Sequence, residues 1–366
     1  MSQQGASPAR QGDDWWGELY DGTTPDTGPA RTPDSLDDRF ASARNAVTER
    51  PRPPDHPADP AVSPDHVGSG PPTYDPEPTA LPPADPDAPD GLVPDTVLDG
   101  ARYGPCTLRA VSQRGDSARY RGEPRRDALL TARFGTGERA LVLVAMATGA
   151  RAVPGAHLAA AEACRGIARA VGRSHRRLAE DIRAARRGDL KSGLHRLADR
   201  ALGGLRASAG TEAPVAGLRC LLLPADPDCR VRVFFGVGDG GLFRLRDGTW
   251  QDIEPRLTAD DTAPGAPPGD DRTASRAGAP RPGPPDPRPP REPFRFRASV
   301  ARPGDVLVLC TAGLADPLRD TEALRARLAR RWSGGSPPGL AAFLADARVR
   351  VKGYADDRTA AAVWEA

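Results

Sequence analysis

Residues 141–163 have the layout in which many enzymes hold a ligand. The apolar run 141–145 predicts a buried strand, a loop of small residues follows it, and an alanine-rich segment predicts a helix after the loop. A ligand site at such a junction requires an acid, an amide or a hydroxyl group. The loop contains Thr148 and no other side chain of these kinds. The sequence therefore raises the question of which functional group is missing here.

Other common site types lack the residues that they need. A Walker-type phosphate loop requires glycine before its lysine, whereas Lys191 and Lys352, the two lysines of the chain, follow apolar residues. The GxSxG motif of many serine hydrolases is absent. The glycines at 236, 238 and 241 spell GxGxxG, but they lie between two predicted strands and not at the start of a helix. They indicate a tight turn instead of a dinucleotide site.

Charge is distributed unevenly along the 366 residues. Residues 1–100 carry 19 acidic and 6 basic side chains, a net charge of −13, so the rest of the chain carries +15 although the whole carries +2. Nearly all basic residues are arginine, which together with abundant alanine, proline and glycine indicates GC-rich coding. We therefore expect no nucleic-acid partner.

The cysteines and the apolar runs bear on where in the cell the protein is located. Five cysteines, an odd number with no CxxC pair, predict reduced thiols in a cytoplasmic protein. The longest apolar run, around 140–150, is far shorter than the about 20 residues that a membrane helix needs. The N-terminus has no basic region followed by an apolar stretch. We expect a soluble protein that is not exported and does not contact a membrane.

Two proline-rich segments set the domain organisation. Residues 1–100 combine proline with aspartate and have too few apolar side chains to offset the entropy of ordering, so we expect a disordered acidic tail. Residues 255–293 have the same character, and strand patterns resume on both sides. We expect them to form a disordered insertion within a single domain that spans residues 101–366.

Within that domain, helical and strand periodicities alternate. Strands are expected at 106–113, 128–134, 141–145, 218–224, 231–237, 241–246, 249–253, 294–300, 306–310 and 359–364. Helices are expected at 155–172, at 176–208 with a break near Gly188, at 321–332 and at 337–347. Asp-Gly pairs at 239–240 and 247–248 indicate hairpins. Helices laid against antiparallel strands predict an α+β domain with two sheets between helical layers.

Five segments, in chain order, resemble the motifs of the protein phosphatase 2C family, the metal-dependent PPM-type serine/threonine phosphatases. They are RGDSARYRGEPRRDALL, LVLVAMATGA, VGDGGLFRLRDG, RPGDVLVLCTAGLADPL and DDRTAAAVW. The resemblance covers residues from about 105 to 366. It implies the family's four-layer α/β/β/α sandwich, in which two antiparallel sheets lie between helical layers.

The resemblance also implies which group is missing. The family uses two divalent cations, Mn²⁺ or Mg²⁺, about 3.5–4 Å apart, and several carboxylates must hold them. Asp127 and Asp356 match two of these ligands. The carboxylate that bridges both metals falls on Met146, and the glycine that lends a backbone carbonyl falls on Ala147. An aspartate therefore belongs at position 146.

A second ligand is missing near the C-terminus. The aspartate of the family's SDG motif falls on Ala312, and the acid expected before Asp127 is Arg126. We therefore expect no two-metal cluster and no cofactor. The resemblance then implies a pseudophosphatase, a phosphatase fold retained as a phosphoprotein-binding or regulatory module.

An active enzyme is the alternative. Asp116, Asp305, Asp316 and Asp357 lie near the same motifs and provide carboxylates from which displaced metal ligands would come. In that case the protein is a Mn²⁺- or Mg²⁺-dependent serine/threonine phosphatase. The other interpretation of each aspartate is a surface turn or a helix cap.

Arginines near the first motif suggest that the protein binds phosphate without a metal ion. Arg121, with Arg119 as the alternate, matches the region from which the family grips substrate phosphate, and a guanidinium holds phosphate on its own. The competing interpretation is an arginine on a solvated face. The expected partner is a phosphoprotein or a serine/threonine kinase.

The tail contains a candidate docking motif, DDWWGELYD, at residues 13–21. Trp15, Trp16, Leu19 and Tyr20 have the spacing of one apolar helix face flanked by acids. Such a segment is typical of a motif that folds on a protein partner. The alternative is that the acidic tail lies on the chain's own arginine-rich stretch, 176–208.

Overall fold

The computed structural model describes residues 65–208, 215–255 and 293–366. The predicted motif at 13–21 and nearly all of the predicted insertion at 255–293 lie outside these residues. The described residues belong to one compact unit, Pro64–Ala366.

Two antiparallel sheets form the centre of this unit. The five-stranded sheet has the order β10 (Arg295–Val300), β7 (Val231–Val237), β6 (Val215–Pro224), β5 (Leu141–Gly149) and β4 (Asp127–Phe134). The six-stranded sheet has the order β2 (Thr96–Tyr103), β3 (Cys106–Gln113), β13 (Arg358–Glu365), β11 (Val306–Cys310), β8 (Gly241–Arg246) and β9 (Thr249–Asp252). A short parallel pair joins β1 (His66–Val67) to β12 (Arg350–Val351).

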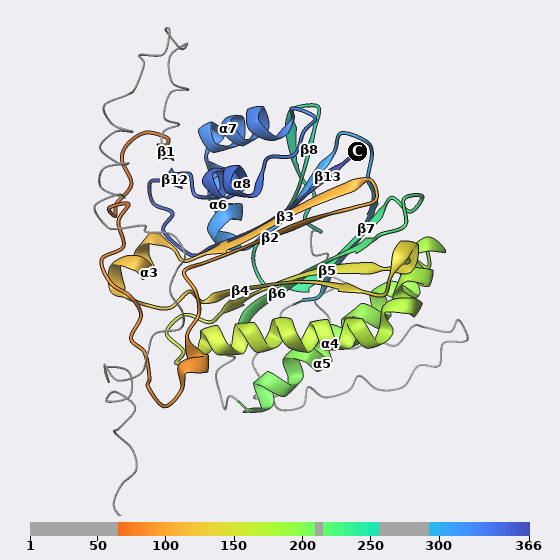
Figure 1. Cartoon of the computed structure of the whole chain (residues 1–366), viewed down its shortest axis with the longest axis horizontal. Helices are drawn as coiled ribbons and strands as arrows, with labels where there is room; N and C mark the ends of the chain where they lie inside the picture. Colours follow the sequence, from red (N-terminus) through yellow and green to blue (C-terminus); the bar gives the residue numbers. More distant parts are fainter. Residues whose placement is uncertain (1–64, 209–214, 256–292) are drawn as a thin grey trace, which may run out of the picture. The chain divides into compact units, whose positions relative to one another are not determined.

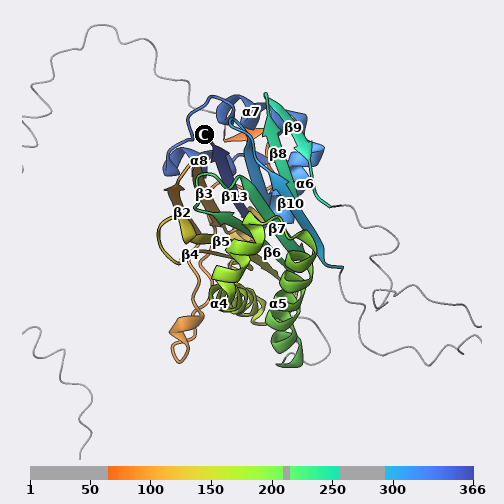
Figure 2. The same ribbon diagram turned by 90° about the vertical axis from the view of Figure 1, so that its right-hand side faces the viewer.

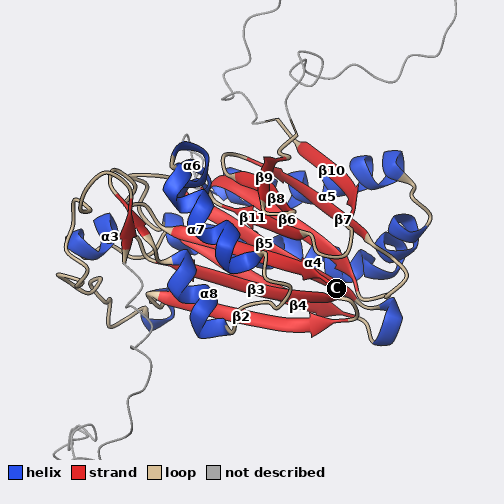
Figure 3. Ribbon diagram, turned by 90° about the horizontal axis from the view of Figure 1, so that it is seen from above, coloured by secondary structure: helices blue, strands red, loops and turns tan. Residues whose placement is uncertain are grey.

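Helices cover the outer face of each sheet (Figures 1 and 2). The five-stranded sheet is covered by α4 (Ala156–Arg183) and α5 (Arg187–Ser208). The six-stranded sheet is covered by α6 (Ala312–Asp320), α7 (Glu322–Trp332) and α8 (Leu340–Ala347), which Figure 3 shows lying across it. Short helices occur at α3 (Asp116–Arg121), η1 (Pro89–Gly91) and η2 (Gly137–Arg139). The predicted α/β/β/α sandwich is confirmed.

Strand β5 explains why the sequence reads as a continuous apolar run at this point. Its side chains alternate between the two faces of the sheet. Leu141, Leu143 and Ala145 pack in the core beneath the helices, whereas Val144 and Met146 pack in the core between the two sheets. Both faces of the strand are buried, so no polar alternation is possible.

The structure corrects the predicted domain boundary at residue 100. Strand β2 begins at Thr96 and pairs with β3 along its whole length, so the boundary falls inside a strand. The upstream residue Asp95 accepts hydrogen bonds from Arg114 and Arg119. Composition averaged over a proline-rich region hides a single strand at its end, because pairing with the following strand β3, and not local composition, holds that strand.

The helical prediction also needs correction. The expected helix at 155–172 and the start of the stretch at 176–208 form one helix, α4, because no proline interrupts them. The break lies at residues 184–186, before Gly188, where Ala185 adopts a φ of 52°. Helices α3 and α6, of 6 and 9 residues, were not predicted.

A buried ion pair links the two sheets and gives the first prediction. Arg232 of β7 donates to both carboxylate oxygens of Glu365 of β13 at 2.7 and 2.8 Å, and the two side chains are 1% and 0% exposed. Because Arg232→Met leaves the carboxylate buried without a partner, we expect it to cost about 3–5 kcal/mol of unfolding free energy. Urea denaturation at pH 7 measures this loss.

Two controls accompany that measurement. Arg165→Met removes a partner of Glu162 in an exposed pair, so it should change stability by about 1 kcal/mol or less. Adding Glu365→Leu to Arg232→Met should recover much of the loss, because the unpaired charge is removed. A loss for Arg232→Met no larger than that for Arg165→Met would contradict the account.

Candidate functional site

A cavity of about 370 Å³ lies where strands of both sheets end beside the start of α6. Its walls come from the starts of β4 and β6, the end of β5, the turn after β7 and the turn before β13. Two arginines, Arg126 and Arg151, line it. The acidic lining residues are Asp127, Asp239, Asp316, Asp356 and Asp357.

Close backbone approaches bring these segments together. The turn at 355–357 lies between Gly115 on one side and Gly313 on the other. A Cβ added to Gly115 would lie 2.3 Å from the carbonyl carbon of Asp356, and one added to Gly313 would lie 2.0 Å from the carbonyl oxygen of Asp357. Only glycine permits this spacing, so these two residues fix the turn against α3 and α6.

Asp127 lies at the centre of a ring of hydroxyl groups. Thr148 donates to its Oδ1 at 2.8 Å, and Thr311 and Thr359 donate to its Oδ2 at 2.7 and 2.9 Å. The threonines come from β5, the start of α6 and β13, so this one carboxyl group joins both sheets. Both of its oxygens are thereby used inside the protein.

The pKa of Asp127 is raised from 3.8 to about 7, mainly because the side chain is buried and secondly because the carboxylate of Asp357 disfavours a second negative charge. The hydrogen bonds from Thr311, Thr148 and Thr359 oppose this rise, because they stabilise the charged form. The folded protein therefore favours the neutral acid at this position.

Asp356, the other predicted metal ligand, is paired with arginine. Its carboxylate accepts a hydrogen bond from Arg151 and lies 3.9 Å from Arg126. The neighbouring Asp357 is buried and accepts backbone N–H bonds from Gly115 at 2.8 Å and from Arg126 at 2.6 Å. Asp357 thus fixes the loop before β4, the structural role that was the alternative to metal binding.

Met146, Ala147 and Ala312, the positions predicted to have lost the family's metal ligands, differ in their surroundings. Met146 is 0% exposed and packs in the core between the sheets, and Ala147 is buried on the opposite face of β5. Ala312 begins α6 and lines the cavity. Of these three residues, Ala312 lines the cavity, whereas Met146 belongs to the apolar core.

The other nearby aspartates differ in location. Arg350 donates to Asp116 at 2.7 Å, and Arg246 donates to Asp305 at 2.6 Å; neither acid lines the cavity. Asp316 does line it, and burial raises its pKa. Asp116 and Asp305 are therefore structural, as the turn or cap interpretation expected, although Asp305 is buried and not on the surface.

The family's metal pair does not fit these donors. Among residues 65–208, 215–255 and 293–366, no three histidine, cysteine, aspartate or glutamate side chains are grouped in a way that would hold a metal ion. Asp127 accepts three hydroxyl donors, and Asp356 is paired with two arginines. Two dications require several available anionic ligands between and around them. Of the five aspartates that line the cavity, Asp127, Asp356 and Asp357 already accept hydrogen bonds from hydroxyl, guanidinium or backbone N–H groups.

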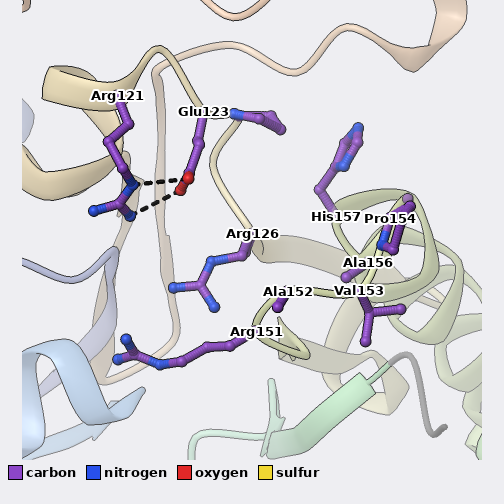
Figure 4. Close-up of a pocket in the computed structure, with 11 residues that line it drawn as sticks. Arg121, Glu123, Arg126, Arg151, Ala152, Val153, Pro154, Ala156 and His157 are labelled. Atoms are coloured by element: carbon purple, nitrogen blue, oxygen red, sulfur yellow. Dashed lines mark hydrogen bonds and ion pairs between the residues drawn. The ribbon is translucent and has the colours of Figure 1, made fainter.

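An adjoining pocket of about 490 Å³ holds the arginine predicted to bind phosphate (Figure 4). Arg121 donates to Glu123 at 2.7 and 2.8 Å, and Arg126 and Arg151 line the same pocket. Arg119 instead is buried and paired with Asp95 at 2.6 Å, so it is not available as the alternate phosphate ligand. This pairing was not predicted, because Asp95 was assigned to the disordered tail.

Thr311, Thr359 and Arg151 are site residues that the sequence analysis missed. Thr311 precedes Ala312, and Thr359 is the last residue of the DDRT segment. Each threonine is a polar side chain at the end of an apolar strand, which was a usable signal. Arg151 had no such signal, because its partner Asp356 lies 205 residues away.

The family model of protein phosphatase 2C matches residues 114–347. The chain belongs to the protein phosphatase 2C family. The match confirms the resemblance stated from the five segments. It includes Asp127, Met146 and Ala312 of this protein phosphatase 2C domain, and Asp356 lies beyond it.

Solved phosphatase structures are similar to this protein phosphatase 2C domain at low sequence identity. The serine/threonine phosphatase PstP/Ppp of Mycobacterium tuberculosis is 19% identical, with 71% of this chain and 99% of that chain covered and a TM-score of 0.42. PppA of Pseudomonas aeruginosa is 20% identical, with coverages of 73% and 100% and a TM-score of 0.40. The phosphatase domain of SpoIIE from Bacillus subtilis is 15% identical, with coverages of 74% and 92% and a TM-score of 0.38. No curated protein sequence matches the chain.

Proposed function

We propose that this protein is a pseudophosphatase, a protein phosphatase 2C domain that binds or regulates without hydrolysing phosphate esters. One observation carries the proposal: both oxygens of Asp127, a retained ligand position, accept hydrogen bonds from threonine hydroxyls inside the protein. The carboxyl group joins the two sheets, and a cation would have to compete with these three donors for its oxygens. The family's chemistry requires such a ligand to be available and charged.

The electrostatics around the cavity support the same proposal. Met146 and Ala312 replace two carboxylates, and Arg126 replaces a third acid. Arg126 and Arg151 lie beside Asp356, where they supply positive charge that the family supplies with metal ions. Fixed cations of this kind attract a phosphate group but do not activate a water molecule.

The partner that we propose is a phosphoprotein or a serine/threonine kinase, because arginines line both pockets. We place the protein in the cytoplasm, in keeping with its cysteines, all five of which are free and buried. Within the described residues, no helix has the length and apolar character needed to cross a bilayer. The docking motif of Trp15, Trp16, Leu19 and Tyr20 stays a prediction, and deleting residues 1–63 should remove a pulled-down partner if it is correct.

The test is calorimetric titration of Mn²⁺ and Mg²⁺ into the full-length chain, with p-nitrophenyl phosphate turnover followed in the same samples. We expect no heat of metal binding and no turnover above buffer. Asp127→Asn is the matched variant, because it keeps the shape of the side chain and removes its charge. Metal-dependent turnover that is lost in Asp127→Asn would establish the alternative, an active phosphatase with displaced ligands.

A further inference from the structure

Three arginines gather at the pocket of about 490 Å³ (Figure 4). Arg121 ends α3, Arg126 precedes β4 and Arg151 follows β5, so three separate segments supply them. Figure 4 shows their guanidinium groups extending toward the same open space. Four other residues, Ala152, Val153, Pro154 and Ala156, give the pocket an apolar wall beside these charges.

The carboxylates that pair with these arginines are exposed. Glu123 is 45% exposed and Asp356 is 43% exposed. Ion pairs at such exposure contribute little net free energy, since water screens them and ordering two long side chains costs entropy. A phosphate monoester carries a larger charge than a carboxylate and accepts parallel hydrogen bonds from a guanidinium. It can therefore displace these carboxylates from the arginines.

We infer that Arg126 and Arg151, with Arg121 at the rim, form a metal-independent site for a phosphate monoester dianion. The Asp356 carboxylate is ion-paired with Arg126 and Arg151 when no phosphate is bound, and phosphate displaces it from them. The apolar wall that includes Val153 and Pro154 contacts the organic part of the ligand, which favours a phosphoserine or phosphothreonine peptide over inorganic phosphate. This inference rests on the proposed pseudophosphatase function and specifies the site through which it binds.

Replacing Asp356 has opposite expected effects on phosphate affinity in the two mechanisms. If Asp356 competes with phosphate, Asp356→Asn should tighten phosphate binding about 3- to 10-fold. If Asp356 is instead the ligand of a metal that holds phosphate, the same change should weaken binding. The direction of the change therefore separates a site built from arginine from a site built on metal.

The experiment titrates three probes into the full-length chain in the presence of EDTA: inorganic phosphate, a phosphoserine hexapeptide and the same peptide without phosphate. We expect the phosphopeptide to bind more tightly than inorganic phosphate and the unphosphorylated peptide not to bind. Arg126→Ala and Arg151→Ala should each weaken phosphopeptide binding about 10-fold, the usual cost of losing a charge-assisted hydrogen bond. Arg133→Ala, an exposed arginine outside the pocket, is the control and should change nothing.

Each outcome decides one of the two proposals. Binding that is unchanged in Arg126→Ala and Arg151→Ala, or that is equal for both peptides, overturns the arginine site and leaves the absence of hydrolysis untouched. Equal affinity for inorganic phosphate and the phosphopeptide overturns the peptide assignment. Absence of phosphopeptide binding in EDTA, together with binding and turnover when Mn²⁺ replaces EDTA in a parallel titration, overturns the pseudophosphatase proposal itself.

Discussion

Raising the pH from 5 to 8 is expected to lower the unfolding free energy of this protein by about 2–3 kcal/mol through Asp127. The pKa of this carboxyl group is about 7 in the folded protein and 3.8 in its ordinary state. Since the folded state binds the proton more tightly, the stabilisation is fully present below about pH 4. It is lost as the pH rises through 7, where the folded protein must also release the proton.

Urea denaturation of the full-length chain at pH 5, 6, 7 and 8 measures this change, with Asp127→Asn as the matched control. Asparagine keeps the shape and cannot ionise, so the difference between the two proteins cancels the contributions of histidines and other groups. Asp95, whose pKa is lowered to about 2, acts in the opposite direction but below this pH range. Equal slopes for the two proteins between pH 5 and 8 would contradict the assignment.

Restoring the family's missing carboxylate should destabilise the protein. We expect Met146→Asp to cost about 3–5 kcal/mol, because the side chain is 0% exposed and packs in the apolar core between the sheets. The register places it opposite Leu129, two residues along β4 from Asp127, so the new charge also lies near an existing carboxyl group. The cation opposite this position in the register, Arg219 of β6, is already paired with Glu254 at 2.6 Å.

The informative measurement is urea denaturation of Met146→Asp with and without Mn²⁺. A bound ion stabilises the folded state by mass action, so recovery on adding Mn²⁺ would show that the remaining donors suffice and that the pseudophosphatase proposal is wrong. We expect no recovery, because threonine hydroxyls already donate hydrogen bonds to Asp127 and two arginines form ion pairs with Asp356. Met146→Leu is the control and should cost less than about 1.5 kcal/mol.

The local sequence pattern was sufficient to predict most strands of the fold. The apolar runs at 141–145 and 306–310 are buried on both faces, and strands of this kind are recognisable without knowledge of their neighbours. The hairpin at Asp247-Gly248 also formed as predicted, because turn chemistry is a property of a few adjacent residues. The boundary at residue 100 failed because β2 is held by pairing with β3 and by contacts that composition does not record.

The sequence by itself determined the family, because motif residues keep their order and local setting. The loss of metal ligands at Met146 and Ala312 stays a prediction from the same motifs. Only the tertiary structure decided what the remaining residues do. Thr311 and Thr359 lie 184 and 232 residues from Asp127, and Arg119 is held by an aspartate assigned to the tail. Hydrogen bonds and ion pairs between residues so far apart depend on how the sheets are stacked, and no local periodicity carries that information.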